Sequence, residues 1–406
     1  MMRNALVLAA LGAMPGPPAL AQVPRAGLDA SYSCVTCHAP KRRAFISGVH
    51  AERGIRCHDC HGGNTTVFEL PGAHRGSFVG SPTKLGIARL CASCHSDPNR
   101  MRQYGLPEDQ LAGLRASRHG QLLERGNADA PTCTDCHDAH LIRRASDARS
   151  NTYPANIPGT CARCHDDAAL MGKYGLPTSQ STEYRSSAHG VALFERENHA
   201  APTCIGCHGS HEALPPGVDE VADVCGQCHV LVRQAFFAGA HGAATARGAL
   251  PGCLACHSNH GTEPVRGLVC GNCHAADEPA TAVIARLGRV IATANDELAA
   301  ADTALQELVR SGRVVTDTRF RYRSALTYYR QMAQAQHGLD VETMEDLALR
   351  ITSTTRDIRR AADVAAENRW ERQLLLVPVW FVVLAVAALV GFRLSELRRA
   401  SSQSDT

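Results

Sequence analysis

The sequence predicts a mainly α-helical protein with almost no strand, and three observations lead to this fold class. All 18 cysteines belong to C-x-x-C pairs between Cys34 and Cys273, and loops rich in Gly and Pro separate short segments of this region. Residues 278–373 contain no cysteine and place apolar side chains at helical spacing. Residues 374–392 form an uncharged apolar run, close to the roughly 20 residues that a transmembrane helix needs.

The first element, residues 1–21, is predicted to be a secretory signal peptide. Arg3 provides a positive start, residues 5–13 are apolar, and Ala-Leu-Ala ends at Ala21 as a small-residue cleavage site. The signal predicts export, and with it a location on the periplasmic side of the inner membrane. The formal net charge is only +3, so no strong field favours a nucleic-acid partner.

The second element, residues 22–277, contains nine C-x-x-C pairs, and a histidine follows every one of them. C-x-x-C-H is the motif of covalent c-type haem attachment: two thiols bond to the vinyl groups of one porphyrin edge, and the adjacent imidazole ligates the iron. The predicted thioether residues are Cys34, Cys37, Cys57, Cys60, Cys91, Cys94, Cys133, Cys136, Cys161, Cys164, Cys204, Cys207, Cys225, Cys228, Cys253, Cys256, Cys270 and Cys273. The predicted proximal iron ligands are His38, His61, His95, His137, His165, His208, His229, His257 and His274.

Two other interpretations of the cysteines are weaker. Zinc sites take four Cys or His ligands, often from two such motifs, but nine motifs cannot pair evenly. A disulfide framework suits an exported chain but leaves the nine histidines unexplained. We therefore expect nine covalently bound haems c. Roughly 27 residues per motif between Cys34 and His274 are too few for a peptide core, so the porphyrins are expected to form it.

The motifs are arranged as four modules of two motifs each, followed by one single motif. The segment from Cys91 to His140 recurs from Cys161 to His211, at an offset of 70 residues that grows to 71 near the end. Shorter modules begin at Cys34 and Cys225, and Cys270 opens the ninth site. This repetition predicts one structural unit per module.

Most of the remaining histidines are predicted to be distal iron ligands, because they recur at equivalent places in the modules. One group lies mostly in Ser/Gly-x-His-Gly, and a second group follows a proximal histidine by three residues. At that spacing, members of the second group would share a helix face with their proximal histidine, so they must serve a different iron. The predicted distal ligands are His50, His74, His119, His140, His189, His211, His241, His260 and His337.

Two of these assignments rest on weaker patterns. The first module lacks the trailing histidine, and His74 is expected to replace it. His337 is the candidate for the ninth iron because it lies alone at a break between helices; otherwise one iron is five-coordinate or bound by Met. His58 lies inside a C-x-x-C pair and is not expected to ligate, and His199 is left open.

The third element, residues 278–373, is predicted to be a long helical hairpin or three-helix bundle. Breaks are expected at Ser311-Gly312 and from His337 to Asp340, with a second helix from Thr316 to Gln336 and a third from Val341. The transmembrane helix 374–392 follows. Arginines in the tail 393–406 place the C-terminus in the cytoplasm by the positive-inside rule.

These motifs resemble those of the multihaem c-type cytochrome superfamily, which includes the tetrahaem cytochromes of nitrifiers, pentahaem nitrite reductase and octahaem hydroxylamine oxidoreductase. The likeness covers roughly residues 34–274 and rests on the C-x-x-C-H sites, the Ser-x-His-Gly positions and the C-x-x-C-H-x-x-His variants. It implies electron transfer between periplasmic or membrane redox proteins, possibly with a quinol-oxidising membrane subunit as partner.

The alternative is an enzyme that reduces or oxidises a small nitrogen or sulfur compound at one open iron. No C-x-x-C-Lys motif of the kind found in pentahaem nitrite reductases is present in the sequence. Tyr322, Tyr328 and Tyr329, with nearby arginines, could line a pocket, although packing on a helix explains them more simply. Electron transfer without catalysis is therefore the preferred hypothesis, and we predict no catalytic residues.

Overall fold

The computed structural model describes residues 28–217, 221–262, 269–275 and 278–403. Within these ranges the chain is mainly helical and contains no strand, as the sequence predicts. The predicted signal peptide 1–21 lies outside the described residues, as does the end of the predicted tail, 404–406. The chain divides into two compact units, and the larger part of the cysteine-rich region belongs to the first.

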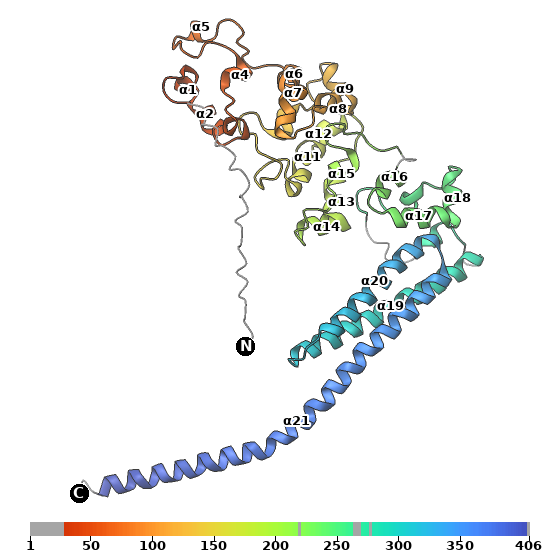
Figure 1. Cartoon of the computed structure of the whole chain (residues 1–406). Helices are drawn as coiled ribbons and strands as arrows, with labels where there is room; N and C mark the ends of the chain where they lie inside the picture. The colour runs from red at the N-terminus through yellow and green to blue at the C-terminus, as the bar shows by residue number, and fades with distance from the viewer. Residues whose placement is uncertain (1–27, 218–220, 263–268, 276–277, 404–406) are drawn as a thin grey trace, which may run out of the picture. The chain divides into compact units, whose positions relative to one another are not determined.

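The first unit contains residues 28–216 and the short segment 259–262. Its helices are short and are joined by turns and loops (Figure 1). They are α1 (Ser33–Cys37), α2 (Ala39–Phe45), α3 (Val49–Glu52), α4 (Cys57–His61), α5 (Leu70–Ala73), α6 (Lys84–His95), α7 (Pro98–Met101), η1 (Arg102–Tyr104), α8 (Gln110–Ala116), α9 (Arg118–Glu124), α10 (Cys133–His137), η2 (Pro154–Asn156), α11 (Ile157–His165), α12 (Ala168–Gly172), α13 (Gln180–Ser186), α14 (Ala188–Phe194) and α15 (Cys204–His208).

The helices of this unit repeat as the sequence does. Gln110–Ala116 and Arg118–Glu124 return as Gln180–Ser186 and Ala188–Phe194, an offset of 70 residues. Buried apolar side chains form only small clusters here; one comprises Ala88, Leu123 and Ala130. Such clusters bury little apolar surface for a unit of this length.

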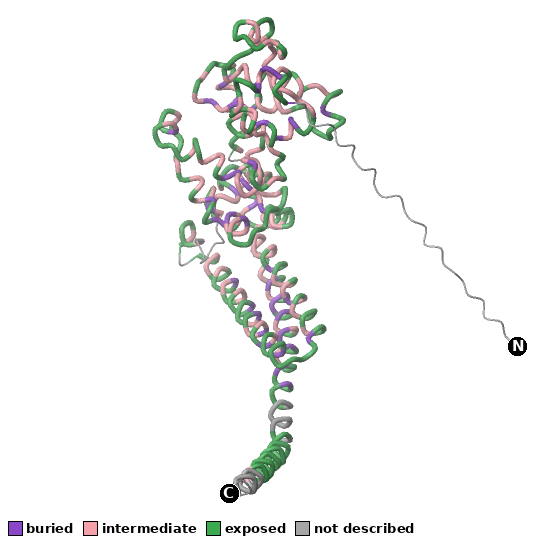
Figure 2. Tube along the Cα trace, turned by 90° about the vertical axis from the view of Figure 1, so that its left-hand side faces the viewer, coloured by how far each residue is buried: buried purple, intermediate pink, exposed green. Residues whose placement is uncertain are grey.

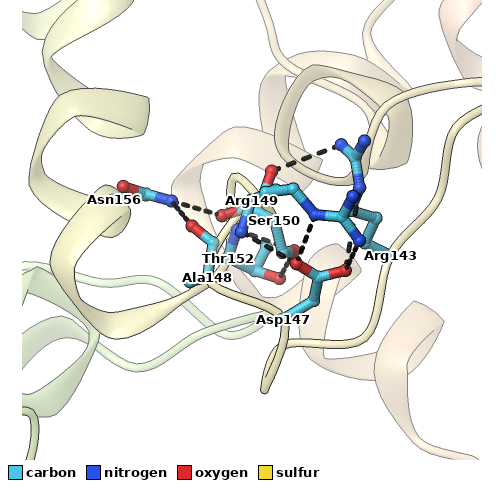
Figure 3. A network of polar contacts seen from close by, with 7 residues as sticks. All are labelled: Arg143, Asp147, Ala148, Arg149, Ser150, Thr152 and Asn156. Carbon is cyan, nitrogen blue, oxygen red and sulfur yellow. Dashed lines mark hydrogen bonds and ion pairs between the residues drawn. The ribbon is translucent and has the colours of Figure 1, made fainter.

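A polar network fixes the loop that joins the two copies (Figure 3). Arg149 donates from Nε and Nη2 to the carboxylate of Asp147, at 3.0 and 2.9 Å, and Arg143 lies 3.8 Å from the same carboxylate. Asn156 Nδ2 donates to the carbonyl oxygen of Ser150 at 2.8 Å. The hydrogen bond from Arg149 is the main reason that the pKa of Asp147 is lowered to about 2. The loop is therefore held by its own side chains.

The described residues of the second unit form three short helices, two 3-10 turns and three long helices. These are α16 (Val221–Gly226), α17 (Val230–Ala238), α18 (Ala240–Ala246), η4 (Gly252–Ala255), η5 (Val269–Asn272), α19 (Pro279–Arg310), α20 (Thr316–Gly338) and α21 (Val341–Gln403). The long helices run side by side as a three-helix bundle, and α21 continues beyond the other two (Figures 1 and 2).

The bundle has a conventional apolar core. Leu287 of α19, Met332 of α20 and Ile351 of α21 are at most 2% exposed and belong to one cluster. A second cluster farther along contains Leu308 and Ile358. The apolar side chains recur at helical spacing, and the buried residues follow one stripe of each helix (Figure 2).

The helix breaks lie close to the predicted positions, with one difference. The second long helix ends at Gly338 rather than Gln336, so His337 lies in its last turn instead of at a break. The physical reason is the cap that follows. Leu339 adopts a left-handed conformation (φ 58°), and the N–H of Asp340 donates to the carbonyl oxygen of Ala335 at 3.3 Å. This pattern closes a helix two residues later than the break that the sequence indicates.

The end of α21 is long and apolar enough to cross a membrane. Leu376–Ser395 spans 20 residues with a mean hydropathy of 2.2, and none of it is buried against other parts of the protein. Trp380 and Phe381, for example, are 63% and 70% exposed. The predicted range 374–392 differs from this segment only at its ends.

Candidate metal centres

Several C-x-x-C-H motifs each form a single helical turn. α4, α10 and α15 begin at the first cysteine and end at the histidine, whereas α6 and α11 carry their motif in the last turn. Thr132 caps α10 and donates its N–H to Asp135 Oδ2 at 2.7 Å. Within one turn, residues i, i+3 and i+4 share a helix face. The two thiols and the imidazole of these motifs therefore lie on the same side.

The cysteines of neighbouring motifs meet. All 18 cysteines fall in the described ranges, and none of them forms a disulfide there. In three modules, the first cysteine of one motif interacts with the first cysteine of the other. These contacts join Cys91 to Cys133, Cys161 to Cys204 and Cys225 to Cys253. The two motifs of these modules consequently lie side by side.

The Ser-x-His-Gly sequence is a helix start. Ser117 is the N-cap of α9, and its Oγ accepts a hydrogen bond from the N–H of Gly120 at 3.0 Å. Ser187 caps α14 in the same way, with Gly190 as donor at 2.9 Å. Both serines are completely buried. The cap fixes where the helix begins, and this in turn places the histidine in the first turn.

The glycine of the motif is required by the preceding helix. A Cβ added at Gly120 would lie 1.8 Å from the carbonyl oxygen of Leu114, and one at Gly190 would lie 2.0 Å from that of Tyr184. These contacts are with backbone atoms, so no side-chain rotation can relieve them. Only glycine allows the two helices to approach this closely.

Eight predicted proximal histidines each face one predicted distal histidine in the described parts of the chain. The ring centroids are 6.0–6.3 Å apart, and the angles between the ring planes range from 14° to 55°. The pairs are His38–His74, His95–His50, His61–His140, His165–His119, His137–His211, His208–His260, His274–His241 and His257–His337.

The separation of the rings distinguishes between kinds of metal centre. With a metal–imidazole bond of about 2.0–2.1 Å and about 1.1 Å from ring nitrogen to centroid, ligands on opposite sides of one metal have centroids about 6.3 Å apart. Two ligands at the tetrahedral angle would have centroids only about 5.1 Å apart. The observed 6.0–6.3 Å fits the opposed arrangement. Among the described residues, no three or more His, Cys, Asp or Glu side chains converge as a tetrahedral site needs.

The pairs connect one module to the next in a regular order. His50 faces the first proximal histidine of the following module, His95, and His119 likewise faces His165. In the opposite direction, a trailing histidine faces the second proximal histidine of the preceding module. His140 faces His61, His211 faces His137, and His260 faces His208.

The trailing histidines face another motif, as expected. The expected cause, a helix face shared with the proximal histidine, is wrong. His140 does not share a helix face with His137, because α10 ends at His137. Asp138 then adopts φ 64° and ψ 168° and turns the chain away. Gly209 follows His208 with φ 80° and ψ 164°. The helix ends before the trailing histidine, and this freedom allows it to reach the neighbouring module.

Backbone hydrogen bonds join the modules beside the paired histidines. The N–H of Val49 donates to the carbonyl oxygen of Ile142 at 2.8 Å, and the N–H of Arg118 donates to that of Ala213 at 3.4 Å. In both cases the donor precedes a distal histidine by one residue, and the acceptor follows a trailing histidine by two. The same joint therefore occurs twice, which explains why the histidine pairing is regular.

His74 and His337 are placed by elements outside this repeat. His74 follows α5 and stacks on Phe78, with centroids 4.1 Å apart, while it faces His38 of its own module. His337 belongs to the helical bundle and faces His257. His38 and His257 are thus paired with histidines that no repeat pattern identifies.

Hydrogen bonds settle which nitrogen is available in several rings. Nδ1 of His61 lies 2.9 Å from the carbonyl oxygen of Val79, and Nδ1 of His208 lies 3.1 Å from that of Leu214. A carbonyl oxygen can only accept, so Nδ1 carries the proton in these rings. Nε2 is then left with a free lone pair, the arrangement that metal-binding histidines normally have.

Burial also favours neutral imidazoles. It lowers the pKa of His50, His119 and His137, and neighbouring histidines lower it further. Charging these rings would place a cation in a poorly hydrated position. Neutral rings are the form that binds a metal.

Four further histidines have contacts that the structure also describes. His189 Nδ1 lies 3.5 Å from Thr262 Oγ1 in the first unit, and His229 precedes α17 in the second. The two histidines that were not predicted to ligate each meet a tyrosine. Tyr32 Oη lies 2.8 Å from Nδ1 of His58, and Tyr153 Oη lies 2.8 Å from Nδ1 of His199.

The aromatic residues considered for an enzyme pocket belong to the bundle. Tyr328 and Tyr329 pack against the core cluster of the three long helices, as does Tyr322. Arg321 pairs with Asp317 and Asp357 at 2.8 and 2.9 Å. The tyrosines therefore pack α20 into the bundle, and the arginine lies on its polar surface.

No protein-family model, curated protein or solved structure matches the chain.

Proposed function

We propose that this chain is a membrane-anchored c-type cytochrome that transfers electrons along nine covalently bound haems. The observation that carries the proposal is the set of opposed histidine pairs, each joining a C-x-x-C-H histidine to a second ring at 6.0–6.3 Å. The two rings of each pair would hold a haem iron between them, and the two thiols of each motif would tether the porphyrin edge. The resemblance to multihaem c-type cytochromes supports the same proposal.

The side chains suit electron transfer better than catalysis. Haem supplies a one-electron redox centre. Two neutral imidazoles per iron leave no position for a substrate, and the Nδ1 hydrogen bonds of rings such as His61 and His208 hold each imidazole in one orientation. The contacts between cysteines of adjacent motifs, such as Cys91 and Cys133, keep neighbouring sites close. Bis-histidine ligation also favours lower potentials than Met ligation.

The apolar end of α21 supports anchoring in the inner membrane. Leu376–Ser395 is long enough to span a bilayer and exposes its apolar side chains. With the predicted signal peptide at one end and Arg398 and Arg399 beyond the span at the other, the bulk of the chain would lie in the periplasm and the C-terminus in the cytoplasm. A quinol-oxidising membrane protein is the proposed electron donor at that surface, because quinol oxidation releases electrons, and periplasmic redox proteins would accept them.

Haem content and spin state test the function. The purified protein should contain nine haems per chain by pyridine haemochrome absorbance, and its oxidised EPR spectrum should be low-spin. A preparation without covalent haem would refute the proposal. A high-spin signal that responds to nitrite would instead favour the small-molecule reductase or oxidase.

A reporter fused to the C-terminus tests the topology. We expect a C-terminal green fluorescent protein to fluoresce and a C-terminal alkaline phosphatase to be inactive, because both would lie in the cytoplasm. Active phosphatase at this position would contradict the proposed orientation.

A further inference from the structure

His337 reaches its partner from a different kind of element than the other paired histidines. It lies in the last turn of α20, within the bundle, whereas His257 follows η4 in the cysteine-rich part of the same unit. The ring centroids are 6.2 Å apart. The contacts that hold α20 against the short helices therefore also determine whether His337 can bind the same metal as His257.

α20 is held there by contact with α17, and two glycines meet where the two helices end. A Cβ added at Gly239, which follows α17, would lie 2.6 Å from the carbonyl oxygen of Gly338 and 2.9 Å from its Cα. These are backbone atoms, so they cannot rotate away. Gly338 is the residue next to His337, and the contact thus lies directly beside the ligand.

Small residues continue this contact on both sides. A Cβ added at Gly338 would lie 3.2 Å from the carbonyl oxygen of Ala235. Ala235, Ala238 and Ala335 line one shallow groove between α17 and the bundle. The absence of larger side chains at these three positions and at the glycines lets the two helices approach at backbone distance.

We propose that the Gly239–Gly338 contact is the positioning element that holds His337 opposite His257 and so completes an iron site from the membrane-linked bundle. This inference rests on the proposed function. A metal–imidazole bond of about 2 Å tolerates little displacement. An added methyl group that separates the two backbones by about 1 Å, enough to restore an ordinary carbon–oxygen contact, would withdraw His337 from its ligating position.

The orientation of the His337 ring supports its role as the positioned group. Its Nδ1 donates to the carbonyl oxygen of Ala333 at 2.5 Å, one turn earlier in α20. The ring is consequently fixed to its own helix, with Nε2 free. Because the His337 ring is hydrogen-bonded to α20, any displacement of α20 also displaces the ring.

The test compares variants of the full-length protein by EPR and cyanide binding. His337→Ala should convert one haem per chain to high spin and bind one cyanide per chain. Gly239→Ala should produce the same signal although His337 is present, with the haem content unchanged. Gly338→Ala, where the neighbour need move only slightly, should give a smaller high-spin fraction. Hydrogen exchange in the last turn of α20 should rise in both glycine variants.

The control is Gly172→Ala, since a Cβ at Gly172 in α12 would meet nothing within 4 Å. It should remain low-spin. If His337→Ala is high-spin but both glycine variants stay fully low-spin, the positioning role is refuted while the ligand assignment stands. If His337→Ala changes nothing, the assignment and this inference both fail. Absence of haem from the wild-type protein would refute the proposed function itself.

Discussion

The rings of His137 and His211 face each other with centroids 6.1 Å apart and planes 16° from parallel. His137 ends the second motif of one repeat, and His211 trails the second motif of the next. The same relationship connects His61 with His140 at 6.2 Å. Each repeat thus supplies a partner to the preceding one, so the repeats should be interchangeable units.

Deleting one complete repeat should therefore preserve every histidine pair. Removal of residues 96–165 joins His95 to Asp166 and brings His211 into the place of His140, opposite His61. Two C-x-x-C-H motifs and two distal histidines are lost together. We expect seven haems per chain by pyridine haemochrome absorbance, all low-spin by EPR.

A deletion out of register provides the control. Removing residues 96–150 takes away one proximal histidine, His137, but two distal ones, His119 and His140. This variant should show one high-spin haem. A high-spin signal of equal size in the in-register deletion would contradict the pairing between repeats.

Asp138 should be a strained residue whose replacement by glycine stabilises the protein. Its φ of 64° and ψ of 168° lie in a region that is almost restricted to glycine and costs other residues about 1–3 kcal/mol. Asp138→Gly should raise the free energy of unfolding by about 1 kcal/mol, after subtracting the greater freedom of glycine in the unfolded chain. The midpoint of guanidinium unfolding measures this change.

Asp138→Ala is the matched variant, because alanine keeps the Cβ and therefore the strain. It should not stabilise the protein. If both variants behaved alike, the side chain of Asp138 rather than its backbone conformation would be responsible.

The repeats, the helix breaks and the predicted ligand types could be read from the sequence because they depend on local spacing. The breaks around Ser311-Gly312 and before Val341 lie where the helices end and begin. The partner of each histidine could not be predicted, because it depends on contacts between modules such as Val49 with Ile142. The haem assignment itself stays a prediction.

The turn at Asp138 and the contact between Gly239 and Gly338 were not predicted from the sequence, for different reasons. The turn at Asp138 was missed because aspartate gives no signal for positive φ, although the equivalent Gly209 does. The contact of Gly239 with Gly338 joins residues far apart in the chain. A glycine next to His337 and another next to the Ala-His-Gly segment were visible, but only the fold shows that they meet.

The loop between the two long modules should depend on Asp147. Its pKa is lowered to about 2 by Arg149, from an ordinary value of about 3.9. Since the folded pKa is lowered, the contribution of this group is fully present above about pH 4 and is lost as the pH falls towards 2. Asp147→Asn should remove it at neutral pH and increase hydrogen exchange in residues 143–156, without changing the absorption spectrum. Asp166→Asn is the control, and equal exchange in both variants would refute the role of Asp147.

Removal of residues 374–406 should release the protein from the membrane without altering the bundle. Ala365 is the last residue of α21 that is described as buried, and the apolar segment begins at Leu376, so the described core and the membrane segment do not overlap. The truncated protein should appear in the soluble periplasmic fraction with nine low-spin haems.

A longer truncation after Asp340 would remove Met344 and Ile351 from the core, loosen α20 and expose one iron to cyanide. Membrane association of the shorter truncation would show that another part of the chain is the anchor.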